Sequence, residues 1–194
     1  MEPESLPSEL SVLDEIRGSC ESFSATRPRE RAKLTGALAM EVIRRWLREG
    51  GISVSARDVY ILGNPTEFDL LAVRRDSVPR HGIIYDPADV AVVLEIKFSG
   101  VFSKDAAQDL RKRFEKVKAD HPHIQCVYLT VQENEKFKSK VTEAELGFPV
   151  FTLNWVDYRD RIVKPGDSLQ RVVECLKNAF LQLPVAATSV GTGR

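Results

Sequence analysis

The run VAVVLEIKF, residues 90–98, constrains the fold more than any other stretch of the chain. Apart from Glu95 and Lys97 its residues are all apolar, a pattern typical of a strand buried on both faces. Side chains alternate between the faces of a strand, so Glu95 and Lys97 project side by side from the face that also carries Val93. An ionised group in a core is costly unless it is paired, hydrogen-bonded or bound to a metal. This placement therefore suggests chemistry.

The segments around this run predict helices and strands in the order α-β-β-β-α-β-β-α. The expected elements are a helix over 27–51, strands over 56–63, 67–75 and 90–98, a helix over 103–120, strands over 124–132 and 148–156, and a helix over 168–183. Short or moderate links between the first three strands favour an antiparallel meander, and the helix after the third favours a parallel pairing with the fourth. The sequence thus predicts an α/β (α+β, mixed-sheet) fold with flanking helices.

The length of 194 residues is that of one ordinary domain. We expect an N-terminal segment over 1–26 that is partly helical, a single domain over 27–183, and a disordered tail over 184–194, which is small and polar.

The chain has the features of a cytoplasmic protein. Its three cysteines, Cys20, Cys126 and Cys175, are far apart, as expected for reduced thiols. The acidic start MEPESLPSEL lacks an apolar core, so we expect no signal peptide. No run of about eighteen apolar residues occurs, so we expect no contact with a membrane.

A second acidic residue is expected to lie close to Glu95. Glu67, Asp69 and Leu71 share one face of the strand before the loop, and Asp69 meets Glu95 if the two strands pair. Two carboxylates brought together raise each other's pKa unless a cation lies between them. Mg²⁺ is the natural partner, because it takes oxygen ligands and keeps several waters. A lysine beside such a site can orient the attacking water or stabilise charge on a phosphate.

These motifs resemble the PD-(D/E)XK nuclease superfamily: EFD ends at Asp69, EIK covers Glu95 to Lys97, and a helix with GALAME precedes both. The resemblance spans roughly residues 30 to 132 and implies a restriction-endonuclease-like αβββαβ core. It implies that Asp69, Glu95 and the main-chain carbonyl of Ile96 bind Mg²⁺, for which Mn²⁺ can substitute. It also implies that Lys97 is the catalytic lysine.

Two helices carry further candidates. By the same resemblance, Glu41 matches an additional catalytic acid on the first helix, and Gln108 matches a glutamine of some subgroups on the second. Glu41 can alternatively form a surface ion pair with Arg45. Gln108 lies opposite the apolar stripe of its helix, on a face that either binds substrate phosphates or is simply solvated, together with Lys104, Arg111 and Lys112.

The sequence therefore predicts a Mg²⁺-dependent nuclease that hydrolyses phosphodiester bonds. The resemblance favours DNA over RNA as the substrate. The formal net charge is zero, so nucleic acid would be bound by a local basic patch. Because the chain is small, a partner protein or a homodimer is expected to contribute to recognition. The alternative is a catalytically inactive module that keeps the fold and binds nucleic acid or a partner protein.

Overall fold

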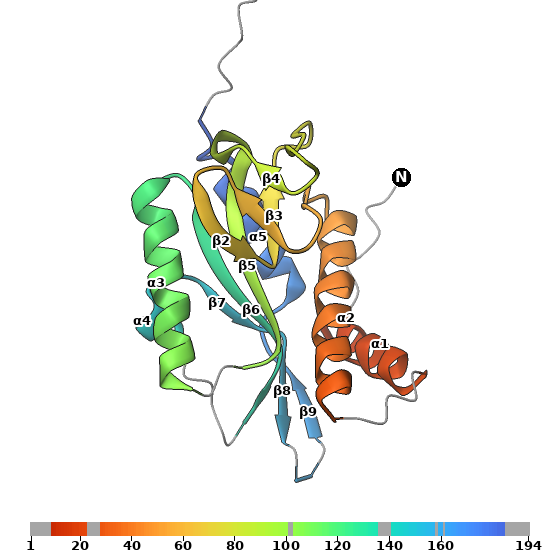
Figure 1. The fold of residues 1–194 in the computed structure, drawn as a ribbon. Coiled ribbons are helices and arrows are strands. Elements are labelled where there is room, and N and C mark those ends of the chain that lie inside the picture. The colour runs from red at the N-terminus through yellow and green to blue at the C-terminus, as the bar shows by residue number, and fades with distance from the viewer. Residues whose placement is uncertain are drawn as a thin grey trace, which may run out of the picture.

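The computed structural model describes residues 9–22, 28–100, 103–135, 141–157, 159–160 and 162–184. The elements in these ranges are α1 (Glu9–Ser22), α2 (Pro28–Glu49), β1 (Val59–Ile61), β2 (Asn64–Phe68), β3 (Leu70–Val73), β4 (Ile84–Tyr85), the 3-10 helix η1 (Pro87–Asp89), β5 (Val90–Ser99), α3 (Lys104–Asp120), β6 (Gln125–Asn134), α4 (Glu143–Leu146), β7 (Val150–Thr152), β8 (Asn154–Asp157), β9 (Ile162–Pro165) and α5 (Leu169–Phe180) (Figure 1). The predicted tail over 184–194 lies, apart from Pro184, outside the described residues.

A mixed sheet forms the centre of the described chain. Its strand order is β3-β5-β6-β8-β9, and β7 also pairs with β6. The strand with the EIK motif, β5, runs antiparallel to β3 and parallel to β6, as the helix between β5 and β6 predicts. Both β5 and β6 are buried along most of their length, which explains their nearly continuous apolar sequence. The predicted mixed-sheet α/β fold is confirmed.

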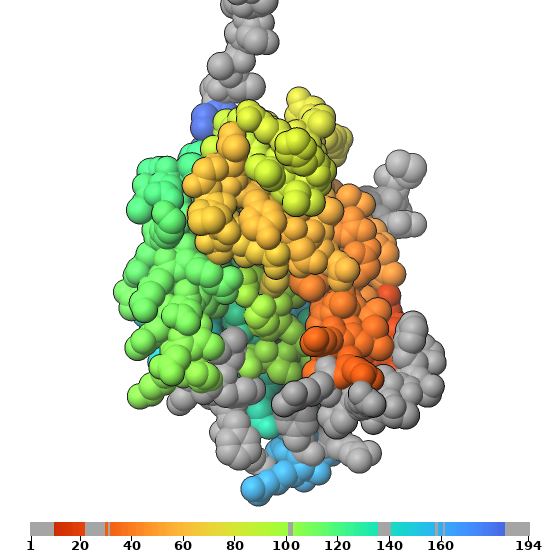
Figure 2. All heavy atoms as spheres, viewed as in Figure 1, coloured from red at the N-terminus to blue at the C-terminus, as the bar shows by residue number. Residues whose placement is uncertain are grey.

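Hydrophobic cores lie on the two faces of this sheet. On one face, α1, α2 and α5 pack over Leu94 and Ile96. On the other face, α3 packs through Phe114 over a cluster that includes Val93. Figure 1 shows β5 between α2 and α3, and in Figure 2 atoms of β5 reach the surface between these helices. Because side chains alternate along β5, Glu95 belongs to the α3 face of the sheet.

The strand predicted over 67–75 is two strands. The first, β2, ends at Phe68 and pairs with β1 in a separate small sheet of order β2-β1-β4. The second, β3, begins at Leu70 and pairs with β5, so Asp69 lies at the bend where the chain passes between the two sheets. The predicted antiparallel pairings, of the first strand with the second and of the second with the third, are confirmed, but they are divided between two sheets instead of forming one continuous meander.

The physical reason is that the outer edge of β3 is already paired. The segment before β1 runs along this edge: Ser55 N donates to Leu71 O, and Val73 N donates to Ser53 O, both at 2.9 Å. With those backbone groups satisfied, β1 cannot pair with β3 and pairs with β2 instead.

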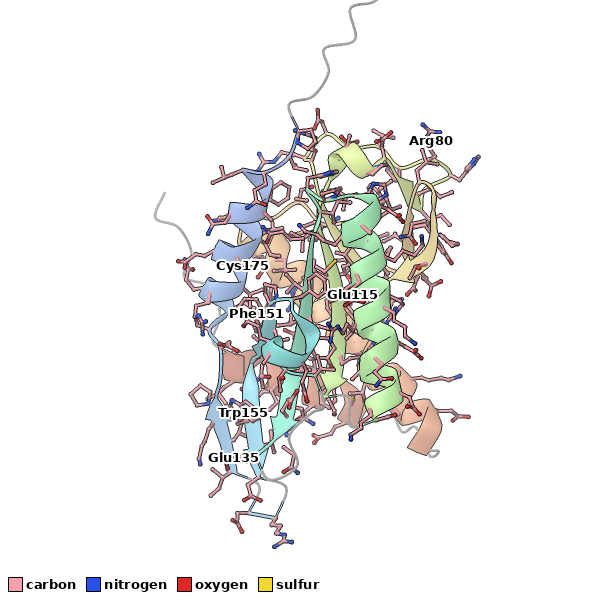
Figure 3. The ribbon with its side chains drawn as sticks, turned by 90° about the vertical axis from the view of Figure 1, so that its left-hand side faces the viewer. Arg80, Glu115, Glu135, Phe151, Trp155 and Cys175 are labelled. Atoms are coloured by element: carbon pink, nitrogen blue, oxygen red, sulfur yellow. The ribbon has the colours of Figure 1, made fainter. Side chains whose placement is uncertain are left out.

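The strand predicted over 148–156 is also two strands, β7 and β8, and both pair parallel with β6. On the edge away from β6, the carboxylate of Asp167 accepts a bond from the Thr152 N–H. Strand β9, which the sequence analysis did not predict, pairs with β8. The β8–β9 hairpin extends beyond the body in both Figure 1 and Figure 3, where the label Trp155 marks it.

Within the described ranges, no helix combines the length and the apolar character needed to cross a bilayer.

The thiols of Cys20, Cys126 and Cys175 are free, in agreement with the prediction of unpaired cysteines. Burial raises the pKa of the Cys126 thiol to about 12.

Candidate active site

Asp69, Glu95 and Lys97 come together where β3 begins, beside the second half of β5. The register pairs Leu70 with Leu94, so Asp69 and Glu95 stand opposite each other one step further along the two strands. The side chain of Glu95 is 5% exposed, that of Asp69 19% and that of Lys97 38%. The carboxylates therefore lie below the surface, and the ammonium group lies closer to solvent.

Lys97 connects the two carboxylates. Its Nζ lies 2.8 Å from Glu95 Oε1 and donates to Asp69 Oδ2 at 3.3 Å. The backbone N–H of Ile96 donates to the same Oδ2 at 2.7 Å. These bonds fix the Asp69 side chain against β5, although Asp69 itself lies at a bend.

The bond from the Ile96 N–H indicates where the Ile96 carbonyl points. In an antiparallel ladder the N–H and the C=O of one residue serve the same neighbouring strand. At Asp69 the chain passes out of the ladder that β3 forms with β5. The Ile96 carbonyl therefore faces the same edge of β5 as the Asp69 carboxylate. Three kinds of oxygen, from Asp69, Glu95 and the Ile96 backbone, are thus available at one place.

Burial raises the pKa of the Asp69 carboxyl, and the charge of Glu95 raises it further, against the opposing effects of Lys97 and the Ile96 N–H. Burial lowers the pKa of Lys97, but the charges of Glu95 and Asp69 outweigh burial, so the pKa of Lys97 lies above its ordinary value. Lys97 is therefore an ammonium group at neutral pH. The raised pKa of Asp69 means that Lys97 and the Ile96 N–H do not fully offset burial and the charge of Glu95.

A fourth residue, Arg113 on α3, completes the cluster. Its Nη2 lies 3.0 Å from Glu95 Oε1 and its Nη1 lies 3.4 Å from Glu95 Oε2, so the guanidinium spans both carboxylate oxygens. The sequence analysis did not assign this residue to the site. A signal was present, because Arg113 lies three residues after the buried Leu110 and four before the buried Val117, at the border of the apolar stripe of α3.

Glu41 lies on α2, apart from this network. Its side chain is half exposed and pairs with Arg44, and the hydrogen bond from Arg44 holds the pKa of Glu41 below its ordinary value. Arg45, the partner considered from the sequence, pairs with Glu15 and Glu49 instead. Among the described residues no hydrogen bond or ion pair joins Glu41 to the Asp69–Glu95 cluster.

The other substrate-binding candidates lie on a different flank of α3. Lys104, Gln108 and Arg111 line a cavity of about 370 Å³ between α3 and α4. At 100° per residue, Gln108 and Arg111 lie about 140° and 160° around the helix from Arg113. Arg111 donates to Glu115 and to a carbonyl of α4, while Lys112 is exposed, 3.9 Å from Asp109. The structure therefore does not bring these residues to the Asp69–Glu95 cluster.

The cluster fits a hard divalent cation. Two carboxylates and a backbone carbonyl are the oxygen ligands that Mg²⁺ prefers. Within the described ranges, no group of three or more His, Cys, Asp or Glu side chains could hold a metal ion. An ion at Asp69 and Glu95 would therefore keep water or take substrate oxygens, which is how Mg²⁺ is commonly bound.

Comparisons with known proteins find the fold. No family model matches the chain, and no curated protein matches it. Among solved structures, P. aeruginosa NucC in its cAAA-bound form aligns over 88% of this chain and 90% of its own, with 13% identity and a TM-score of 0.56. E. coli NucC aligns over 88% of this chain in two forms. The alignment with the cAAA-bound form covers 89% of that chain, with 14% identity and a TM-score of 0.55. The alignment with the apo form covers 90% of that chain, with 13% identity and a TM-score of 0.51.

The likeness to the NucC structures covers most of both chains. The likeness confirms that the chain has the restriction-endonuclease-like fold that its motifs implied. At 13–14% identity the comparison establishes the fold, and the roles of individual residues have to be argued from their geometry.

Proposed function

We propose that this protein is a divalent-metal-dependent nuclease that hydrolyses phosphodiester bonds, with DNA as its substrate. The observation that carries the proposal is the contact between Asp69, Glu95 and Lys97 on adjacent strands of a nuclease fold. Buried charges of this kind contribute little to stability when compared with well-packed apolar residues, so a catalytic role accounts for them better than a structural one.

In this proposal Asp69, Glu95 and the Ile96 carbonyl bind Mg²⁺, and Mn²⁺ can substitute. The bound ion would lower the pKa of a coordinated water and neutralise charge on the phosphate. Lys97 acts as a fixed ammonium group, because Asp69 and Glu95 hold its Nζ in place. A fixed positive charge and hydrogen-bond donor stabilises the negative charge that grows on the phosphate in the transition state, and it orients the attacking water.

The arrangement of charge suits a polyanion. The cationic side chains of Lys97 and Arg113 are 38% and 36% exposed, whereas Glu95 lies beneath them at 5%. Atoms of β5 reach the surface between α2 and α3 (Figure 2). A phosphate that approaches this place meets the more exposed Lys97 and Arg113 before Glu95. The choice of DNA rests on the resemblance to PD-(D/E)XK nucleases.

The remaining candidate residues are proposed to act away from the phosphodiester bond that is cut. Glu41 is proposed as an acid that holds a second ion or steers the first. Contacts with phosphates further along the strand are proposed for Lys104, Gln108, Arg111 and Lys112, on the outer flank of α3. A second copy of the chain or a partner protein is proposed to contribute to substrate recognition.

We expect the protein to cleave plasmid DNA in the presence of Mg²⁺ or Mn²⁺ and to lose all cleavage when EDTA removes the ion, because the carboxylates alone cannot activate water. The measurement is conversion of supercoiled plasmid on an agarose gel, with an RNA of matching sequence in parallel. Binding of DNA without cleavage at any divalent ion would favour the alternative, an inactive module with a nuclease fold. Cleavage of the RNA alone would overturn the choice of DNA.

A further inference from the structure

Arg113 engages the carboxylate that the proposed function assigns to the metal. It donates to both oxygens of Glu95, and Lys97 shares Oε1. Asp69 differs, because the hydrogen bonds described for its carboxylate go to Oδ2 alone. Glu95 is therefore the acid whose two oxygens are both taken by cationic side chains.

A divalent ion at Glu95 would stand within a few ångströms of the Arg113 guanidinium. Like charges at such a distance repel, and the repulsion is stronger below the protein surface than in water. An arginine side chain stays protonated in proteins, so it cannot relieve this repulsion by losing its proton. Lys97 contacts only Oε1 of Glu95, whereas Arg113 takes both oxygens and leaves neither for the ion. Arg113 therefore has to move. Its side chain is 36% exposed and can turn toward solvent.

We infer that Arg113 competes with the divalent ion for Glu95 and must be displaced when the ion binds. The inference rests on the proposed function and assigns Arg113 as a positioning residue. Without an ion, the guanidinium pairs with the nearly buried Glu95 carboxylate and keeps it in place on the α3 face of the sheet. With an ion, the same contact opposes binding, so Arg113 sets the ion concentration at which the site fills.

A purely structural role for Arg113 predicts the opposite change in affinity for the ion when Arg113 is removed. If Arg113 only held Glu95 in a geometry favourable for the ion, its removal would loosen the carboxylate and weaken ion binding. If Arg113 competes, its removal strengthens ion binding. The direction of the change in affinity therefore separates the two roles.

The test is calorimetric titration of the full chain with MnCl₂, without nucleic acid. We expect Arg113→Ala to bind Mn²⁺ about fivefold more tightly than the wild type, the effect of losing one competing charge pair. Arg113→Lys, which keeps the charge but not the two-pronged contact, is expected to lie between them. Arg171→Ala removes an arginine of α5 that pairs with Asp167, and is expected to stay within about twofold of the wild type.

Affinity for Mn²⁺ that is equal or weaker in Arg113→Ala would overturn the inference while leaving the proposed function intact. If that variant fails to fold by circular dichroism, Arg113→Lys decides: tighter binding supports competition, and equal or weaker binding overturns it. A wild type that binds no Mn²⁺ would overturn the proposed function and, with it, the role of Arg113.

Discussion

Replacing Lys97 by alanine is expected to reduce the rate of DNA cleavage by roughly 10²- to 10⁴-fold. This is the range found when a general acid or base, or a group that stabilises charge in the transition state, is removed. The reason is the position of the ammonium group, which contacts both Asp69 and Glu95 and carries a pKa above its ordinary value. The measurement is single-turnover cleavage at saturating Mg²⁺, so that a change in ion affinity does not enter the rate.

Binding of Mn²⁺ should survive in the Lys97→Ala variant, because neither carboxylate is removed. Lys164→Ala is the matched control: this lysine pairs with Glu135 at 2.6 Å at the β8–β9 hairpin and should keep the wild-type rate. Cleavage that persists in Lys97→Ala at the wild-type rate would mean that the activity arises from another site or from a contaminating enzyme.

Replacing Asp69 by asparagine is expected to abolish measurable cleavage, a loss of at least about 10³-fold, because the site loses one of its two carboxylates and with it the ion. The same variant should not be destabilised. The pKa of Asp69 is raised by burial and by Glu95, which means that the folded protein disfavours the ionised carboxylate. An asparagine is neutral and its oxygen can still accept from the Ile96 N–H.

The expected direction of the change in melting temperature follows from the dependence of stability on pH. Folding raises the pKa of the Asp69 carboxyl, so its contribution to stability is lost as the pH rises through its unfolded and folded pKa values, and ionised Asp69 lowers the stability of the folded protein. The melting temperature of metal-free Asp69→Asn at pH 7 should therefore equal or exceed that of the wild type. Asp120→Asn, which removes an exposed partner of Lys116, is the control for activity. A clearly lower melting temperature together with wild-type cleavage would contradict both halves of the prediction.

The contact between Asp69, Glu95 and Lys97 could be predicted from the pattern of residues within the strands and from the order of the strands and helices. The alternation of side chains in 90–98 places Glu95 and Lys97 on one face, and an antiparallel partner brings Asp69 opposite Glu95. The helix over 103–120 requires a crossover and thus a parallel pairing of β5 with β6. The alternation and the crossover can be derived from local sequence, whereas the pairing that joins Asp69 to Ile96, 27 residues away, followed from the order of the strands.

Features that depend on long-range pairing were not accessible. The bend at Asp69 arises because residues 53–55 occupy the edge of β3, a contact that no local pattern signals. Arg113 was not assigned to the site, since its contact with Glu95 depends on how α3 packs on the sheet. The pairing of Glu41 with Arg44 rather than Arg45 was missed for a similar reason, because Arg45 is taken by Glu15 on α1.

The account depends on one physical claim: two acids on neighbouring strands are tolerated so close together because they share a divalent ion. Crystals soaked in Mn²⁺ and measured at the manganese absorption edge test this claim directly. The account predicts an anomalous peak between the carboxylates of Asp69 and Glu95, with the guanidinium of Arg113 turned away from Glu95. No peak at millimolar Mn²⁺, or a peak only at a different place in the molecule, would contradict it.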